Sequence, residues 1–194
     1  MFSGIRWIET VFNRHNDPFL AYDKANDALT QHFSHVVGFI TAINWFRRVR
    51  RHGVVTWATE CSTWVWLCRA STGRTELNAQ GFPTACVLDA NRQVVRMCLC
   101  ILFLTAMDVW NLLEQPASSV MEYFKQVVRL MLSLRMFRKH TWMGMFGHWL
   151  RKPTHLYRGV HMFNVIWHKI AARILCEINM NTCGCTCTAP IGKC

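Results

Sequence analysis

Residues 94–113 form the longest apolar stretch of the chain. The seventeen residues between Arg96 and Glu114 contain no Lys, Arg or Glu, and Asp108 and Asn111 are the strongly polar ones among them. A helix of this length covers roughly 25 Å, slightly less than a hydrocarbon core of about 30 Å. The stretch therefore predicts a hydrophobic helix that is either embedded in a membrane or the most buried helix of a soluble protein. We favour membrane embedding, with the helix sheltered by Trp-rich neighbours and partner subunits.

The segments that flank this stretch show helical periodicity. Apolar residues recur at three- and four-residue steps after Asp17-Pro18, which predicts an amphipathic helix over residues 18–48. The same type of pattern predicts a basic amphipathic helical module over residues 119–178, with one helix ending near residue 138 and another over about 155–178. The predicted fold is therefore all-α or mainly α, in a single domain that spans residues 1–194.

Three segments lack a clear helical pattern. Residues 53–68 fit a helix somewhat better than strands, although their Thr, Val and Trp content suits both. Residues 69–93 are rich in turn-forming residues and are expected to form a loop, with a short hairpin around Asp89–Asn91 as the alternative. Residues 179–194 have no periodicity and are predicted to form an irregular Cys-rich tail.

Charge is distributed unevenly along the chain. Up to Phe124 there are 11 Lys and Arg against 10 Asp and Glu, a balance of +1. From Lys125 onward there are 11 basic residues against one acid, Glu177, a balance of +10. Charged residues make up 17% of the chain, compared with about 25% in a typical soluble domain. A basic final third on a chain poor in charge points to phosphate-bearing partners, which are either lipid headgroups or nucleic acid.

Two basic clusters are candidates for contact with phosphate. The first is the predicted lipid-headgroup site on the 119–138 helix, which consists of Arg129, Arg135, Arg138 and Lys139. The second is the run Arg47–His52 at the predicted end of the first helix, which is either a lipid-docking segment or a solvated charged end. Among the acids, Asp108 and Glu60 are expected to be the most buried. We expect Asp108 to reach the membrane interface or to pair with Arg rather than to relay protons.

Ten cysteines raise the question of metal or redox chemistry. The tail places Cys183, Cys185 and Cys187 at alternate positions, so they are candidate ligands for zinc or copper(I). Disulfide bonds or inert thiols explain them equally well. Most other cysteines are expected to behave as small buried apolar residues. No cofactor is predicted. No Gly-rich phosphate loop, Ser/His/Asp order or paired carboxylates stand out, so an enzyme is the least favoured class.

These patterns favour a non-catalytic accessory or structural subunit of a membrane protein complex. The predicted location is the mitochondrial inner membrane, in a respiratory-chain or ATP synthase assembly, where a transmembrane helix would contact core subunits and basic residues would contact cardiolipin-like anionic lipid. One alternative is a basic RNA-binding protein of an organellar ribosome, which the basic, aromatic-rich final third would suit. A second alternative is a thiol- or metal-handling protein that uses the tail cysteines.

Overall fold

The computed structural model describes residues 21–23, 26–142 and 152–159. In chain order, the helices and strands in these ranges are α2 (Val36–Phe46), β1 (Val54–Trp57), the 3-10 helix η1 (Trp66–Cys68), α3 (Arg69–Thr72), α4 (Ala85–Ala106), β2 (Trp110–Pro116), the 3-10 helix η2 (Met121–Tyr123), α5 (Lys125–Ser133), β3 (Phe137–Trp142) and β4 (Pro153–Arg158).

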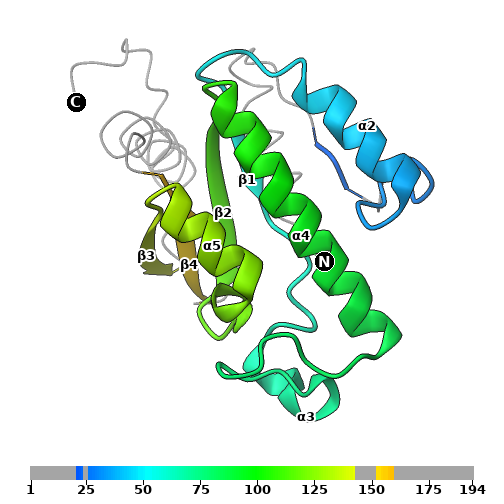
Figure 1. The fold of residues 1–194 in the computed structure, drawn as a ribbon, viewed down its shortest axis with the longest axis vertical. Helices are drawn as coiled ribbons and strands as arrows, with labels where there is room; N and C mark the ends of the chain where they lie inside the picture. The colour runs from blue at the N-terminus through cyan, green and yellow to red at the C-terminus, as the bar shows by residue number, and fades with distance from the viewer. Residues whose placement is uncertain (1–20, 24–25, 143–151, 160–194) are drawn as a thin grey trace, which may run out of the picture.

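The four strands form one mixed sheet in the order β1-β2-β4-β3. Strand β1 runs parallel to β2, whereas β4 is antiparallel to both of its neighbours. Figure 1 shows α4 and α5 in front of the sheet and α2 on the other flank of α4. The described part of the chain therefore combines one sheet with a layer of helices.

The core lies between α4, α5 and the sheet. Helix α4 contributes a buried stripe at helical spacing, made of Val94, Met97, Ile101 and Leu104. The other walls of this core come from Trp57 of β1, Leu113 of β2, Tyr157 of β4, and Val127 and Leu130 of α5. One face of α4 is consequently fixed against the sheet, and its opposite face is left on the surface.

The predicted all-α or mainly α fold is wrong, and so is the continuous helix over 94–113. Helix α4 begins at Ala85 and ends at Ala106, after which Asp108 adopts a left-handed conformation with φ of 57°. The chain then enters β2, which pairs with a strand on each side. Residues 110–113 (Trp-Asn-Leu-Leu) continue the apolar run of α4 directly into β2, so hydropathy alone does not mark where the helix ends and the strand begins.

Other predicted boundaries change as well. The helix favoured for residues 53–68 is wrong, because the chain forms β1 and then η1 there. The helix expected over 119–138 is reduced to α5, and residues from Phe137 onward form β3. Residues 153–158, where a final helix was predicted to begin, form β4, and residues 160–194 lie outside the described part of the chain. These strands are short, and their apolar residues also match a helical spacing.

The loop or hairpin predicted for residues 85–93 is wrong, because these residues form the N-terminal half of α4. Val87, Ala90, Asn91 and Val94 are buried at the spacing of a helix face. The helix predicted over 18–48 is also shorter than expected, since α2 covers only Val36–Phe46 within the described residues. A turn precedes α2, where Asp27 accepts hydrogen bonds from the backbone N–H groups of Leu29 and Thr30.

The transmembrane prediction is overturned by these boundaries. Within residues 21–23, 26–142 and 152–159, no helix has both the length and the apolar composition needed to cross a bilayer. Helix α4 has 22 residues, but its first twelve include the charged residues Asp89, Arg92 and Arg96.

A buried arginine joins the loop before α4 to the rest of the core. The Arg74 guanidinium lies 3.4 Å from the centroid of the Trp64 ring, and both side chains are almost completely inaccessible to solvent. Arg74 donates to Asn91 Oδ1 of α4 at 2.9 Å. The same guanidinium donates to backbone carbonyl groups of Ala79, Gln80 and Val87.

No carboxylate accepts a hydrogen bond from Arg74 among the described residues, so carbonyl groups and an aromatic face compensate this charge. Burial lowers the pKa of Arg74 to about 10, which leaves the side chain charged at neutral pH. The turn at Gly81, next to Gln80, leaves no room for a side chain. Gly81 has φ of 71°, and a Cβ at this position would lie 2.6 Å from Thr72 O.

We predict that Arg74→Met lowers the free energy of unfolding by about 3 kcal/mol or more, because several buried carbonyl groups lose their donor. Arg74→Lys should also be strongly destabilising, since a single ammonium group cannot reach acceptors arranged around a planar guanidinium. Denaturant unfolding followed by circular dichroism measures both. Arg69→Met is the matched control, because Arg69 also covers a Trp ring, at 3.8 Å from the centroid of Trp66, but is exposed. Equal losses for Arg69→Met and Arg74→Met would contradict this role.

Candidate functional surface

Helices α2, α4 and α5 carry several exposed large apolar side chains on the sides that do not face the core, and those of α5 also line a hollow beside β3. We call this set the helical face; it consists of Val36, Val37 and Ile40 on α2, Leu99, Leu102 and Phe103 on α4, and Val128 and Leu132 on α5. Their exposed fractions range from 37% for Phe103 to 74% for Leu132. Scattered exposed apolar residues are normal, but a group on adjoining helices indicates a surface that contacts another molecule.

The charge on the same helices is predominantly positive. Helices α2 and α5 contain no Asp or Glu, and the single acid of α4, Asp89, accepts hydrogen bonds from Arg92 and Gln93. Helix α5 adds Lys125 and Arg129, both of which are exposed. The helical face is therefore apolar, with a basic margin and almost no negative charge.

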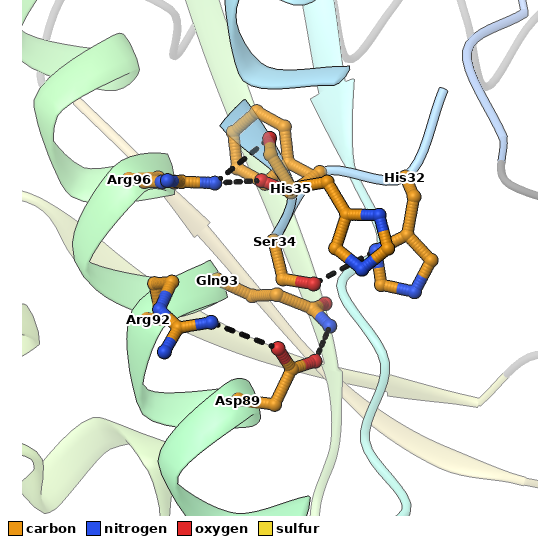
Figure 2. A network of polar contacts seen from close by, with 8 residues as sticks. His32, Ser34, His35, Asp89, Arg92, Gln93 and Arg96 are labelled. Atoms are coloured by element: carbon orange, nitrogen blue, oxygen red, sulfur yellow. Dashed lines mark hydrogen bonds and ion pairs between the residues drawn. The ribbon is translucent and has the colours of Figure 1, made fainter. Parts of the chain in front are cut away.

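A polar network holds α2 beside α4 (Figure 2). Arg96 of α4 donates to the backbone carbonyl groups of Phe33 and His35, at 2.9 and 3.0 Å. Its guanidinium also lies 4.8 Å from the centroid of the Phe39 ring. The backbone at His32 passes so close to Gly38 of α2 that a Cβ on Gly38 would lie 2.2 Å from His32 O. These contacts fix the position of α2, and with it the extent of the helical face.

The same network contains Ser, His and Asp side chains, but it is not arranged for nucleophilic catalysis. Ser34 Oγ lies 2.8 Å from His32 Nδ1, and the His32 and His35 rings are stacked with centroids 4.1 Å apart. Ser34 is buried, so its hydroxyl group is not accessible to a substrate. The cluster therefore fixes the segment before α2 to α4.

The structure does not bring the four predicted headgroup residues into one patch. Arg129 is exposed on α5, and Arg135 is exposed in the turn that follows, with φ of 46°. Arg138 donates to both carboxylate oxygens of Glu122, at 2.7 and 2.9 Å, so its charge is compensated. Lys139 is exposed on β3, at the position next to Arg138, and therefore lies on the opposite face of the strand.

Arg138 and Glu122 belong to a hollow between α5, η2 and β3. Its volume is about 300 Å³, and its lining is mostly apolar: Glu122, Tyr123, Val128, Met131, Leu132 and Arg138. The Tyr157 hydroxyl group donates to Glu122 Oε2 at 3.0 Å, and burial together with the Glu122 carboxylate raises the Tyr157 pKa. Glu122 thus has two strong donors and lacks the free carboxylate that a general base would need.

The structure also revises which acids are buried. Glu60 and Asp108 are both exposed, contrary to the prediction, whereas the expected pairing of Asp108 with an arginine is confirmed by its ion pair with Arg51. The buried acid is Glu114 of β2, whose carboxylate oxygens have no hydrogen-bond partner among the described residues. Burial raises the pKa of Glu114 to about 7, although Lys152 opposes this shift. The sequence pattern does not reveal this site, because Glu114 stands where the predicted 94–113 helix ends and resembles its polar boundary.

The described cysteines support the expectation of buried, unreactive thiols at two positions. Cys98 and Cys100 are buried in α4, and burial raises the pKa of each thiol to about 12. In the parts of the chain that the structure describes, no three His, Cys, Asp or Glu side chains are grouped so that they could hold a metal ion. The candidate ligands Cys183, Cys185 and Cys187 lie outside those parts.

The raised pKa of Glu114 predicts a specific pH dependence of stability. The folded state favours the protonated carboxyl group, so this group stabilises the fold most fully below its ordinary pKa of 4.5. The stabilisation decreases as the pH rises from 4.5 to about 7 and then stays constant. We expect Glu114→Gln to remove this dependence and to raise the free energy of unfolding at pH 8 by about 1–3 kcal/mol.

Urea unfolding at a series of pH values checks this expectation. Glu76→Gln is the control, because it removes an exposed acid of the loop before α4 and should leave the shape of the profile unchanged. A profile for Glu114→Gln that is parallel to that of the unsubstituted protein would show that Glu114 ionises normally in the fold.

Comparison with known proteins does not assign the chain to a family. No protein-family model matches the chain, and neither curated proteins nor solved structures show significant similarity to it.

Proposed function

We propose that this protein is a non-catalytic, peripheral component of a membrane-bound assembly, and that it docks its helical face on the surface of an anionic bilayer. The observation that carries the proposal is the combination of eight exposed large apolar side chains with helices that contain a single acid, Asp89. An interfacial protein needs both features, because apolar side chains enter the headgroup region while cations attract anionic lipids.

The two contributions are of comparable size. Burial of apolar surface is favourable by about 25 cal/mol per Å², so several half-exposed Leu and Val side chains contribute a few kcal/mol. Each Lys or Arg close to an anionic leaflet contributes about 1 kcal/mol at ordinary ionic strength. Lys125 and Arg129 on α5 are placed to do this. In this arrangement the helices lie along the bilayer surface.

Nucleic acid is the main alternative partner. Basic side chains attract RNA as well as lipid, and the RNA-binding alternative fits the net charge of +11. A nucleic-acid surface, however, gains little from exposed aliphatic residues such as Leu99 and Leu102, which are half-exposed on α4. The observations therefore favour a lipid surface. The mitochondrial location and the thiol- or metal-handling alternative remain predictions, since no described residue bears on them.

Vesicle binding tests the proposal. We expect the protein to co-sediment with phosphatidylcholine vesicles that contain cardiolipin and to bind pure phosphatidylcholine vesicles much more weakly. A Leu99→Gln/Leu102→Gln double variant should bind at least about tenfold more weakly, because two apolar side chains no longer gain from burial. Gln is a good helix former, so α4 should be retained.

A Leu67→Gln/Leu77→Gln double variant is the matched control. Both leucines are more than 90% exposed but lie in η1 and the loop before α4, outside the helical face. This control should bind like the unsubstituted protein. Equal losses in the two double variants would contradict docking through the helical face. Tighter binding to an RNA oligonucleotide than to the anionic vesicles, abolished by moderate salt, would instead favour the nucleic-acid alternative.

A further inference from the structure

The connection between α2 and β1 is an ordered and strongly basic turn. We call residues 47–52 (Arg47, Arg48, Val49, Arg50, Arg51 and His52) the arginine turn. It continues from the last turn of α2, with the Arg48 and Val49 N–H groups donating to the Trp45 and Phe46 carbonyl groups, both at 3.0 Å. It closes with a hydrogen bond of 2.8 Å from Gly53 N to Arg50 O. Backbone hydrogen bonds therefore hold the turn at both of its ends.

The arginine turn is also fixed to the turn that follows α4. His52 N donates to Asp108 O at 2.8 Å, and Trp110 N donates to Gly53 O at 2.8 Å. Arg51 Nε donates to Asp108 Oδ2 at 2.8 Å, and the His52 and Trp110 rings have centroids 5.7 Å apart. Both His52 and Asp108 have positive φ, a costly conformation for residues other than Gly that persists only where surrounding contacts impose it.

Most of the charge on this turn is uncompensated. Arg51 is paired with Asp108, but the exposed side chains of Arg47, Arg48 and Arg50 have no hydrogen-bond or ion-pair partner in the described part of the chain. Four arginines and one acid give a balance of +4 − 1 = +3 over these two connected turns. Like charges held this close repel one another, so the arrangement favours binding of a compact anion with several charges.

We propose that the arginine turn is a binding site for a ligand that carries two or more neighbouring phosphate groups. Guanidinium groups bind phosphate with two parallel hydrogen bonds, and three of them within four residues exceed what one monophosphate can satisfy. The last carbonyl groups of α2 carry partial negative charge, so the ligand contacts the arginine side chains and not the backbone. The phosphate groups come from a lipid headgroup or from a soluble polyphosphate.

This inference does not depend on bilayer docking by the helical face, because a soluble probe tests it. Isothermal titration calorimetry with inorganic tripolyphosphate should show saturable binding, and inorganic monophosphate at matched ionic strength should bind much more weakly. Loss of two charge-assisted partners in Arg48→Gln/Arg50→Gln should weaken tripolyphosphate binding about tenfold or more. Thermal unfolding should show that this surface variant is folded.

Arg69→Gln/Arg92→Gln is the matched control. It removes the same number of charges from exposed residues of α3 and α4, outside the arginine turn, and should weaken binding less than about twofold. Equal losses in the two double variants would overturn the proposal, because binding would then follow net charge alone. Monophosphate binding as tight as tripolyphosphate binding would overturn it as well.

Vesicle binding distinguishes a lipid headgroup from a soluble polyphosphate as the source of the phosphate groups. Vesicles that contain a bisphosphorylated inositol lipid are compared with phosphatidylserine vesicles of equal surface charge. Preference for the inositol lipid that depends on Arg48 and Arg50 assigns the site to a headgroup. Tripolyphosphate binding without such a preference assigns it to a soluble ligand. If an RNA oligonucleotide bound through the same two arginines more tightly than tripolyphosphate, the proposal would be replaced by a nucleic-acid site.

Discussion

Among the described residues no carboxylate pairs with the buried charge of Arg74, and the position of α4 depends on how that charge is compensated. The guanidinium stacks on Trp64 and donates to Asn91 and to carbonyl groups of the loop that leads into α4. A buried cation with these partners is stable only when all of them are in place, so loop, ring and helix must assemble together. Arg74 therefore holds the N-terminal half of α4, the longest helix, in position.

The surface properties follow from the position of α4. Its inner stripe packs on the sheet, so Leu99, Leu102 and Phe103 are left exposed on its outer side. The C-terminal end of α4 leads into the turn at Asp108, which is bonded to the arginine turn. The apolar helical face and the uncompensated arginines are thus parts of one scaffold. This relation is the physical basis for proposing a protein that binds an anionic surface.

Sequence patterns predicted some of these features and not others, for identifiable reasons. Helix α5 and the apolar half of α4 were recognisable from their helical spacing, and the arginine run was visible as a charge cluster. Strand β2 was not recognised, because its first four residues continue the apolar run of α4 without a break in hydropathy. The first half of α4 was hidden by Asp89 and Asn91, which resemble turn residues but are a surface acid and a buried partner of Arg74. Nothing local in the sequence distinguishes the buried Arg74 from the exposed Arg69.

The most direct test of the account is to observe which side chains reach the lipid. Methyl NMR spectra of the protein on anionic nanodiscs with spin-labelled lipid would report this residue by residue. The account predicts strong broadening for the methyl groups of Leu99, Leu102 and Leu132, and little for Leu77, which is fully exposed in the loop before α4. Broadening of Leu77 equal to that of the three helical leucines, or no broadening at all, would contradict docking through the helical face.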